Sequence, residues 1–338
     1  MTISRRSPLV LTYLIMAALM LSGCVPDWAS VAAAPSSTPD ASVASPTSAS
    51  GRTTTAGPTT ATAPSTSSAA GAYSKIMIVV LENHSRSAAL DGMPYLRSQA
   101  ERYGVAARSY AVTHPSLPNY LAIAGGSTFG VRDNRSPASH RLTGQSVFGQ
   151  VLDAGGTAKT YAEAMPGNCE TSPEGRYAVK HNPWPYFADA EERAACLRFN
   201  VPSGTPERGA LRDDIIAGEL PTFSMLIPDL CNDAHDCSLR TADGWLRSWL
   251  IALEAGPDFE AARLLVVVTF DEDDHDAGNH ILTAFLHPAL EHVTIQPRFD
   301  QYAVSGLVSR LVGAPPLREA ASATDLQELL RDAGLPAR

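Results

Sequence analysis

The sequence predicts an α/β fold, a three-layer α/β/α sandwich whose central sheet is mostly parallel. Three apolar runs, at 75–81, 222–227 and 264–270, are continuous rather than alternating, which is typical of strands buried on both faces of a parallel sheet. The domain that they indicate begins near Tyr73 and extends over 73–338, a length that gives ample core for independent stability.

Residues 1–24 have the pattern of an export signal. Arg5 and Arg6 precede the apolar run 9–21, which is too short to span a bilayer as a permanent helix. The four residues that end at Cys24 resemble the lipobox of bacterial lipoproteins, in which the cysteine is lipidated and becomes the mature N-terminus. A soluble secreted protein cleaved nearby is the alternative. The arginine pair also leaves export by the twin-Arg route open.

Residues 25–72 predict a disordered linker. From 29 to 72 almost every residue is Ala, Ser, Thr, Pro or Gly. Such a stretch cannot bury enough apolar area to offset the entropy cost of ordering it. We therefore expect the domain 73–338 to be exported and held through lipid on the outer side of the cell membrane. Glycosylation of the linker remains open.

The overall composition excludes one class of partner. The chain has 338 residues, of which 44% are hydrophobic and 18% charged, and its formal net charge is −9. Because binding to phosphate backbones requires stripes of Lys and Arg, we expect no nucleic-acid partner. A monomer is expected.

Four cysteines lie in the domain: Cys169, Cys196, Cys231 and Cys237. An even count in an exported chain favours two disulfides, and the sequence alone allows three connectivities. We favour Cys169–Cys196 and Cys231–Cys237 because each pair brackets one loop-like segment. A zinc cluster is the competing interpretation, but no C-x-x-C spacing supports it.

Helices and a short strand are expected between the first two apolar runs. Residues 93–103 have a helical pattern closed by Gly104, and residues 147–152 and 159–162 are expected as a helix and a short strand. The span 166–206 is rich in Pro, Asn and charged residues, so we expect a long functional excursion there.

The C-terminal part returns to regular elements. Trp245 and Trp249, with neighbouring leucines, mark an amphipathic helix whose aromatic side chains face the core. Further elements are expected in this order: a strand at 281–286, a helix at 301–311 and a helix at 324–333. Thr324 and Gln327 predict a capping box at the start of the last helix.

The stretch 113–121, Thr-His-Pro-Ser-Leu-Pro-Asn-Tyr-Leu, contains the candidate nucleophile, Ser116. It predicts a loop that leads into a short helix, because Ser116 precedes a proline suited to a first helical turn and an apolar run that stops at Gly125. The start of such a helix offers unpaired N–H groups to an anion. Alone, the pattern fits an ordinary helix cap equally well.

Acidic and amide residues follow all three buried strands. Glu82 and Asn83 end the first, Asp229 follows the second, and Asp271 and Glu272 end the third. In open α/β sheets, sites gather outside the carboxyl ends of the strands. Clustered carboxylates repel one another unless a cation lies between them, so the sequence predicts a divalent metal ion, of unknown identity. The oxygen ligands favour a hard ion, whereas the nearby His235 and His280 would also suit zinc or iron.

These segments together resemble a known family. The motifs are Glu82-Asn83-His84, the stretch 113–120, Pro228-Asp229 with Asn232-Asp233-Ala234-His235, and Thr269-Phe270-Asp271-Glu272. In this order they look like the phosphoesterase family of bacterial phospholipases C and secreted acid phosphatases. That family belongs to the alkaline phosphatase superfamily, so the resemblance implies an alkaline phosphatase-like sandwich.

The resemblance also implies a set of site residues. The metal ligands would be Glu82, Asn83, Asp271 and Glu272, with Ser116 as both ligand and nucleophile. The remaining roles implied are phosphoryl contact by Asn119, phosphate contact or protonation of the leaving group by His235 and His181, and a second metal site formed with Asp229 or Asp233 and His280.

The first motif and the Lys180-His181-Asn182-Pro183 segment look closer to the acid phosphatase branch than to the phospholipase branch. The expected activity is therefore metal-dependent hydrolysis of phosphate monoesters through a phosphoserine. The substrate would be a phosphorylated small molecule or a phospholipid head group. Phospholipase C or phosphodiesterase activity is the alternative, and a non-catalytic binding lipoprotein is the third hypothesis.

Several other polar residues are expected to have no catalytic role. The run 273–276 is expected to be a solvated loop. A surface or core role is expected for four histidines: His114, His140, His287 and His292.

Overall fold

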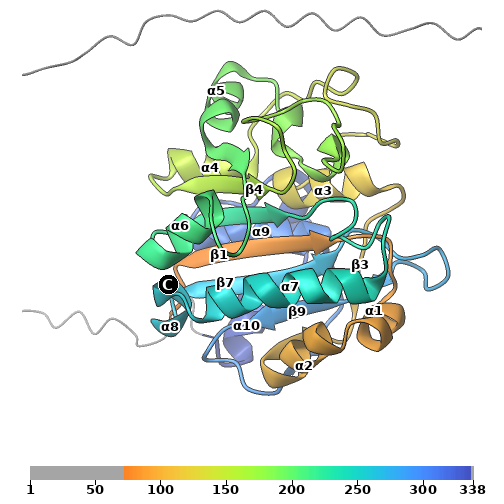
Figure 1. Ribbon diagram of the computed structural model, residues 1–338, viewed down its shortest axis with the longest axis vertical. Coiled ribbons are helices and arrows are strands. Elements are labelled where there is room, and N and C mark those ends of the chain that lie inside the picture. The colour runs from red at the N-terminus through yellow and green to blue at the C-terminus, as the bar shows by residue number, and fades with distance from the viewer. Residues whose placement is uncertain (1–71, 336–338) are drawn as a thin grey trace, which may run out of the picture. The chain divides into compact units, whose positions relative to one another are not determined.

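The computed structural model describes residues 72–335, and in it the three apolar runs lie side by side (Figure 1). β7 (Leu264–Phe270), β1 (Lys75–Leu81) and β6 (Phe223–Ile227) are neighbouring parallel strands, with β1 in the middle. Apart from Lys75, every residue of these strands is buried. The predicted α/β fold with a mostly parallel sheet is confirmed.

The three strands are the centre of an eight-stranded sheet. Its order is β10 (Val293–Ile295), β2 (Gly104–Ala106), β9 (Thr283–Leu286), β7, β1, β6, β4 (Ala158–Ala162) and β5 (Asn200–Pro202). β9 runs antiparallel to both β7 and β2, and the other pairs are parallel. The polar carboxyl ends of β1, β6 and β7 therefore meet at one edge.

The strand predicted at 281–286 is two strands, so that prediction is wrong in detail. β8 (His280–Ile281) belongs to a small sheet with the order β11 (Phe299–Asp300), β3 (Ser109–Tyr110), β8. After Leu282 the chain enters β9 of the large sheet. One continuous apolar run can serve two sheets because burial alone does not fix the pairing partner.

Helices cover both faces of the sheet; in Figure 1, α7 lies in front of it and α9 behind. The helices that pack with one another around α7 are α1 (Arg86–Gly92), α2 (Pro94–Arg102), α6 (Ala210–Ala217), α7 (Leu239–Glu254) and α8 (Pro257–Glu260). Those around α9 are α3 (Ser116–Gly125), α4 (Val147–Asp153), α9 (Gln301–Leu311) and α10 (Leu326–Asp332). The predicted three layers are thus present.

Two helix ends show how local chemistry sets the boundaries. Gly126 ends α3 with a φ of 66°, and a Cβ at this position would lie 2.3 Å from the carbonyl oxygen of Leu317, so only glycine fits. The capping box predicted at Thr324 is wrong. Asp325 caps α10 by accepting from the main-chain N–H of Glu328, whereas the Thr324 hydroxyl donates to the carbonyl of Arg298.

The predicted excursion is an ordered segment between β4 and β5. It contains two short 3₁₀ turns, η1 (Val179–His181) and η2 (Trp184–Tyr186), and helix α5 (Ala190–Phe199). A further 3₁₀ segment, η3 (Arg318–Ser322), precedes α10. Both predicted disulfides, Cys169–Cys196 and Cys231–Cys237, are confirmed.

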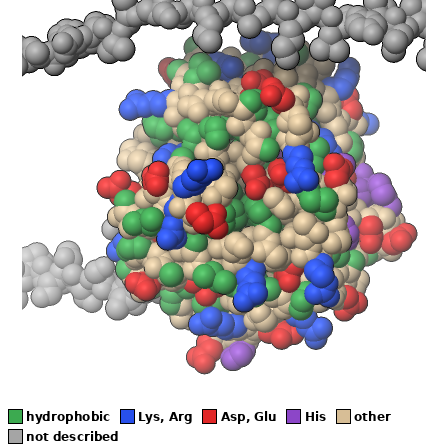
Figure 2. All heavy atoms as spheres, in the orientation of Figure 1, with side chains coloured by type: hydrophobic (Ala, Val, Ile, Leu, Met, Phe, Trp, Pro, Cys, Tyr) green, Lys and Arg blue, Asp and Glu red, His purple; other side chains and the backbone are tan. Residues whose placement is uncertain are grey.

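The N-terminal predictions, namely the signal at 1–24 with Cys24 and the linker up to residue 71, lie outside the described residues. Among residues 72–335, no helix combines the length and the apolar character needed to cross a bilayer. On the face of these residues drawn in Figure 2, Lys and Arg side chains are interspersed with Asp and Glu. Charges of both signs therefore share that face.

The disulfides allow a test of the excursion's contribution to stability. Replacing Cys169 and Cys196 with Ser should lower the free energy of unfolding by about 3.5 kcal/mol, because the bond closes a loop with a sequence separation of 27. Replacing Cys231 and Cys237, separated by 6, should cost about 2 kcal/mol. Urea unfolding of both double variants and the parent gives the comparison. A larger loss from the shorter loop would contradict it.

Candidate active site

The candidate site lies at the carboxyl ends of β1, β6 and β7, where the chain leaves the sheet. Leu81 of β1 and Phe270 of β7 are paired in register, so Glu82 and Asp271 follow at neighbouring positions. The main-chain N–H of Glu82 also donates to the carbonyl of Asp233, beyond β6. The structure thus brings together acidic residues that lie more than 150 positions apart in the chain.

Asp271 is a fully buried carboxylate whose two oxygens have different surroundings. Its Oδ1 accepts from the main-chain N–H groups of Asn83, at 2.9 Å, and Glu272, at 2.7 Å. Its Oδ2 is buried and has no hydrogen-bond partner. Burial, with the charges of Glu82 and Glu272, raises the pKa of Asp271 well above its usual value.

Ser116 begins α3 and faces two of these carboxylates. Its Oγ lies 3.2 Å from Oε2 of Glu82 and 3.4 Å from Oε1 of Glu272. Burial and the charge of Glu82 raise the pKa of Glu272 to about 8. The structure therefore places the candidate nucleophile among the carboxylates that the sequence assigned to the metal.

Glu82 is the most constrained member of the group. Tyr120 donates to its Oε1 at 2.6 Å, and Nε2 of His181 lies 3.1 Å from its Oε2. Burial, the largest single effect, raises the pKa of Glu82, but the charge and close polar contact of His181, the charge of Lys180 and the hydrogen bond of Tyr120 together lower it to about 2. Glu82 is therefore the carboxylate that stays charged in this group.

His181 lies beneath the site rather than at its surface. It is buried between Glu82 and Asp233, whose Oδ2 is 3.0 Å from Nδ1, and its ring stacks on Tyr120. Burial would lower the pKa of His181, but the two carboxylates raise it. Neither ring nitrogen has the alignment of a hydrogen bond. The ring is thus held close to two anions while both nitrogens keep unused bonding capacity.

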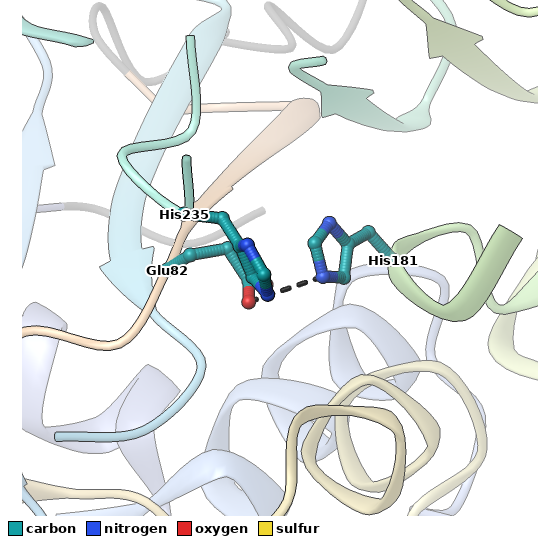
Figure 3. Close-up of side chains that lie close together, drawn as sticks. All are labelled: Glu82, His181 and His235. Atoms are coloured by element: carbon teal, nitrogen blue, oxygen red, sulfur yellow. Dashed lines mark ion pairs between the residues drawn. The ribbon is translucent and has the colours of Figure 1, made fainter. Parts of the chain in front are cut away.

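His235 completes a group of three potential metal ligands. Figure 3 shows Glu82, His181 and His235 pointing toward one another from the end of β1, from η1 and from the segment after β6. Their ligand atoms lie within 4.8 Å of one another. His235 is the exposed member, with Nδ1 at 2.7 Å from Asp236 and Nε2 at 3.1 Å from the ammonium of Lys180.

The donor set fits a divalent metal ion. Asp271 Oδ2, Asp233 Oδ2 and both nitrogens of His181 are buried without hydrogen-bond partners. Polar atoms buried in this state are costly unless a ligand or ion engages them. Carboxylate and hydroxyl oxygens suit a hard ion, and the imidazoles extend the choice to zinc or iron.

Asn119 is tied by several hydrogen bonds to the loop that precedes Ser116. Its Oδ1 accepts from the main-chain N–H groups of Val112 and Thr113, and its Nδ2 donates to the carbonyl of Thr113 at 2.8 Å. A longer contact of 3.4 Å reaches Glu272. Gln301 of α9 also accepts from Val112 and donates to the carbonyl of Asp271. Asn119 thus fixes the loop that carries Ser116.

The anion-binding start of α3 is partly occupied by protein. The N–H of Leu117 donates to Oδ1 of Asn134 at 2.9 Å. This side chain comes from the loop after α3 and was not singled out in the sequence. It takes one of the donors expected to face a phosphoryl group.

Two residues expected at a second metal site lie apart from the three-residue group. His280 pairs with Tyr110 in the small sheet, stacks on its ring, and contacts the carbonyl of Ala107 through Nε2. Asp229 accepts from the main-chain N–H groups of Cys231 and Asn232, which is the geometry of a turn. Asp233, by contrast, reaches His181.

Asp273 contradicts the expectation of a solvated loop, and His114 lies between it and Glu272. Asp273 is buried, not solvated, and accepts from the main-chain N–H groups of His275, Ala277 and Asn279. These bonds hold its pKa below the usual value although burial opposes them. His114 bridges this carboxylate, at 3.1 Å, and that of Glu272, at 3.0 Å. In the sequence, the position of His114 two residues before Ser116 could have identified it as a neighbour of the site.

Hydrogen bonds link the five residues that the resemblance implies as metal ligands: Glu82, Asn83, Ser116, Asp271 and Glu272. The structure adds others for which the sequence indicated no role: His114, Tyr120, Lys180 and Gln301. Tyr120 stood inside the nucleophile motif, and a buried tyrosine hydroxyl requires a partner.

Known proteins resemble this chain over most of the described domain. A family model described as the Phosphoesterase family matches residues 70–286. A phosphatidylinositol-3-phosphatase of Mycobacterium tuberculosis is 32% identical over 270 residues, which cover 78% of this chain and 85% of that protein. An acid phosphatase of Aspergillus fumigatus is 31% identical over 266 residues, covering 73% of this chain and 56% of that protein.

A phosphate-repressible acid phosphatase of Penicillium chrysogenum is 28% identical over 276 residues, covering 77% of this chain and 64% of that protein. This chain therefore spans less than two thirds of each fungal relative's length.

Solved structures agree on the fold. A protein in the alkaline phosphatase superfamily from Vibrio parahaemolyticus has a TM-score of 0.50 at 12% identity, over 76% of this chain and 70% of that one. The lipoteichoic acid synthase LtaP from Listeria monocytogenes has a TM-score of 0.54 at 10% identity, over 76% of each chain. With this fold, and with a family model matching more than half of its length, the chain belongs to the Phosphoesterase family.

Proposed function

We propose that this phosphoesterase hydrolyses phosphate monoesters through a phosphoserine at Ser116. The observation that carries the proposal is the position of Ser116 Oγ, 3.2 Å from Glu82 and 3.4 Å from Glu272, within a buried group of carboxylates. A serine hydroxyl that faces two buried carboxylates contributes little to apolar packing. It fits a nucleophile whose activation depends on a bound cation.

The metal ion would be held by carboxylate oxygens of Glu82, Asp271 and Glu272, with Asn83 and the Ser116 hydroxyl beside them. When bound, a divalent ion lowers the pKa of a coordinated hydroxyl and draws charge from the phosphoryl group. The rest of the mechanism consists of positioning and proton transfer by side chains.

Ser116 Oγ attacks phosphorus in line with the leaving oxygen, and the P–O bond to the alcohol breaks. The Oγ proton would pass to solvent water, because a bound divalent ion would lower the pKa of the Ser116 hydroxyl. His235, exposed and oriented through Nδ1 by Asp236, gives a proton to the departing alkoxide. Water then gives a proton to His235 and attacks the phosphoserine, the bond between Ser116 Oγ and phosphorus breaks, and phosphate is released. Ser116 Oγ takes back a proton from solvent.

His181 positions Glu82 in this scheme. It is buried between Glu82 and Asp233 and stacked on Tyr120, so it holds the Glu82 carboxylate in place from the protein interior. Asn119 positions the nucleophile by holding the Thr113 loop. A hydrogen bond from Asn119 to the phosphoryl group would come from the donor that now makes the 3.4 Å contact with Glu272.

The relatives support a monoester substrate. Their names are those of acid phosphatases and a phosphatidylinositol-3-phosphatase. We propose a phosphorylated small molecule or a phospholipid head group, recognised in part by the ordered segment between β4 and β5. The alternative is phosphodiester hydrolysis of the phospholipase C type. Relative rates on a monoester and a diester with the same leaving group distinguish the two.

Replacing Ser116 with Ala should reduce release of phosphate from an aryl phosphate monoester by roughly 10³-fold or more, because the covalent route is lost. Ser309→Ala is the matched control, since Ser309 is a buried serine in α9 whose hydroxyl donates to a main-chain carbonyl. Steady-state kinetics of the purified 73–338 fragment give both values. Equal activity of Ser116→Ala and the parent would refute the proposed nucleophile.

Removal of the metal should destabilise the protein as well as inactivate it. Without a cation, Glu82, Asp271 and Glu272 repel one another, so a chelator should lower the melting temperature by about 5 °C or more. Asp271→Asn removes one buried charge and should reduce that shift. Calorimetric scans with verified metal content test both statements. An unchanged melting temperature in fully demetallated parent protein would count against the metal site.

We also propose that the enzyme is exported and anchored through lipid at Cys24, as the sequence of residues 1–24 predicts. Cys24→Ala should then release the enzyme from the membrane fraction, since an acyl anchor contributes about 0.8 kcal/mol per buried methylene. Fractionation of cells expressing the full chain checks this. Retention of the variant in the membrane fraction would contradict lipid anchoring at this cysteine.

A further inference from the structure

Lys180 lies at the exposed side of the site on a rigidly supported turn. It precedes the buried His181 in η1 and is half-buried itself. The next residue, Asn182, is completely buried and exchanges hydrogen bonds with Asn200 of β5, at 3.0 and 2.8 Å. The hydroxyl of Tyr177 accepts a further bond from Asn182. The backbone that carries Lys180 is therefore fixed relative to the sheet.

The ammonium of Lys180 has an imidazole, that of His235, as its hydrogen-bond partner. It lies 3.1 Å from Nε2 of His235, and among the described residues no carboxylate forms an ion pair with it. A hydrogen bond to a neutral imidazole supplies much less electrostatic stabilisation than one to an anion. The lysine is thus oriented toward the site without being neutralised there.

The ammonium of Lys180 lies at the edge of the group that surrounds Ser116. It is 3.1 Å from Nε2 of His235, and the ligand atoms of His235, His181 and Glu82 lie within 4.8 Å of one another. Oε2 of Glu82 is in turn 3.2 Å from Ser116 Oγ. A phosphoryl group attacked by Ser116 would therefore be within reach of the flexible Lys180 side chain.

We propose that Lys180 binds a non-bridging oxygen of the substrate's phosphoryl group and makes the enzyme prefer monoesters to diesters. This proposal rests on the function proposed above. In it, the ammonium exchanges the neutral His235 for an anionic oxygen, forming a charge-assisted hydrogen bond. Lysine suits this task because its compact charge and three donors need no fixed bidentate geometry.

The preference for monoesters follows from charge. A phosphate monoester carries close to two negative charges near neutral pH, whereas a diester carries one. The diester also has one fewer non-bridging oxygen, because the second ester group replaces it. A fixed ammonium in addition to the metal ion therefore stabilises bound monoester more than bound diester, and more so as charge develops on the transferred group.

The exchange also frees His235. While Lys180 donates to Nε2, that nitrogen's lone pair is occupied and cannot carry the proton needed by the leaving group. When Lys180 turns to the phosphoryl oxygen, Nε2 can hold a proton, and Asp236 at Nδ1 keeps the ring oriented. Binding of the phosphoryl group would thus prepare the acid for the step that follows.

The test compares Lys180→Met, which removes the charge, with Lys180→Arg, which retains it. Arg198→Met is the control, because Arg198 is an exposed cation of the same segment that packs over Phe199. For each purified, metal-analysed protein, kcat/KM is measured on an aryl phosphate monoester and on the corresponding diester. Inhibition by inorganic phosphate provides a readout of binding without turnover.

Lys180→Met should lose roughly 10- to 100-fold in kcat/KM on the monoester and weaken phosphate inhibition by about 10-fold or more, as expected for loss of one charge-assisted bond. The diester rate should change by about threefold at most. Lys180→Arg should recover most of the loss, and Arg198→Met should match the parent. Metal content should be equal in all four proteins.

An unchanged monoester-to-diester ratio and unchanged phosphate inhibition in Lys180→Met would overturn the proposal while leaving the proposed function intact. Equal losses on both substrates with no change in phosphate inhibition would also overturn it, since they indicate a purely structural role. A parent enzyme that turns over only diesters would instead refute the proposed function, and the two failures are therefore distinguishable.

Discussion

Three carboxylates meet at the carboxyl ends of β1 and β7, and much of the surrounding structure serves to keep them there. Glu82 and Asp271 are fully buried and Glu272 nearly so. Anions brought out of water in this way repel one another. Burial and the charge of Glu82 raise the pKa of Glu272 to about 8, whereas at Glu82 the combined effect of His181, Lys180 and Tyr120 exceeds that of burial and lowers the pKa to about 2. A divalent cation among them would turn this repulsion into binding energy and would place its charge next to Ser116.

The scaffold around this group is rigid where the chemistry requires it. The loop before Ser116 is held from two sides, by Asn119 of α3 and by Gln301 of α9, which also bonds to the carbonyl of Asp271. Two packed helices of one layer, α3 and α9, thus hold the nucleophile in place relative to the carboxylates at the end of the sheet. Such preorganisation is the main contribution that a protein makes to phosphoryl transfer. The segment between β4 and β5 supplies the cationic Lys180 and the buried His181.

The sequence predicted the central strands and their acidic ends because parallel strands buried on both faces leave continuous apolar runs. It could not assign Asp273, whose burial depends on a turn that offers it the N–H groups of His275, Ala277 and Asn279. The pairing of His280 with Tyr110 depends on a second sheet formed by distant short strands. The resemblance implied a possible ligand at His280, but nothing in the sequence indicated the small sheet in which its ring stacks on Tyr110.

The central claim, that a metal ion joins these carboxylates to Ser116, is tested most directly by crystallography of the metal-loaded enzyme with anomalous scattering. The account predicts an anomalous peak within coordination distance, about 2.0–2.6 Å, of Ser116 Oγ and of oxygens from Glu82, Asp271 and Glu272. A protein that binds its metal stoichiometrically but gives no peak at this position, or a peak away from Ser116, would contradict it.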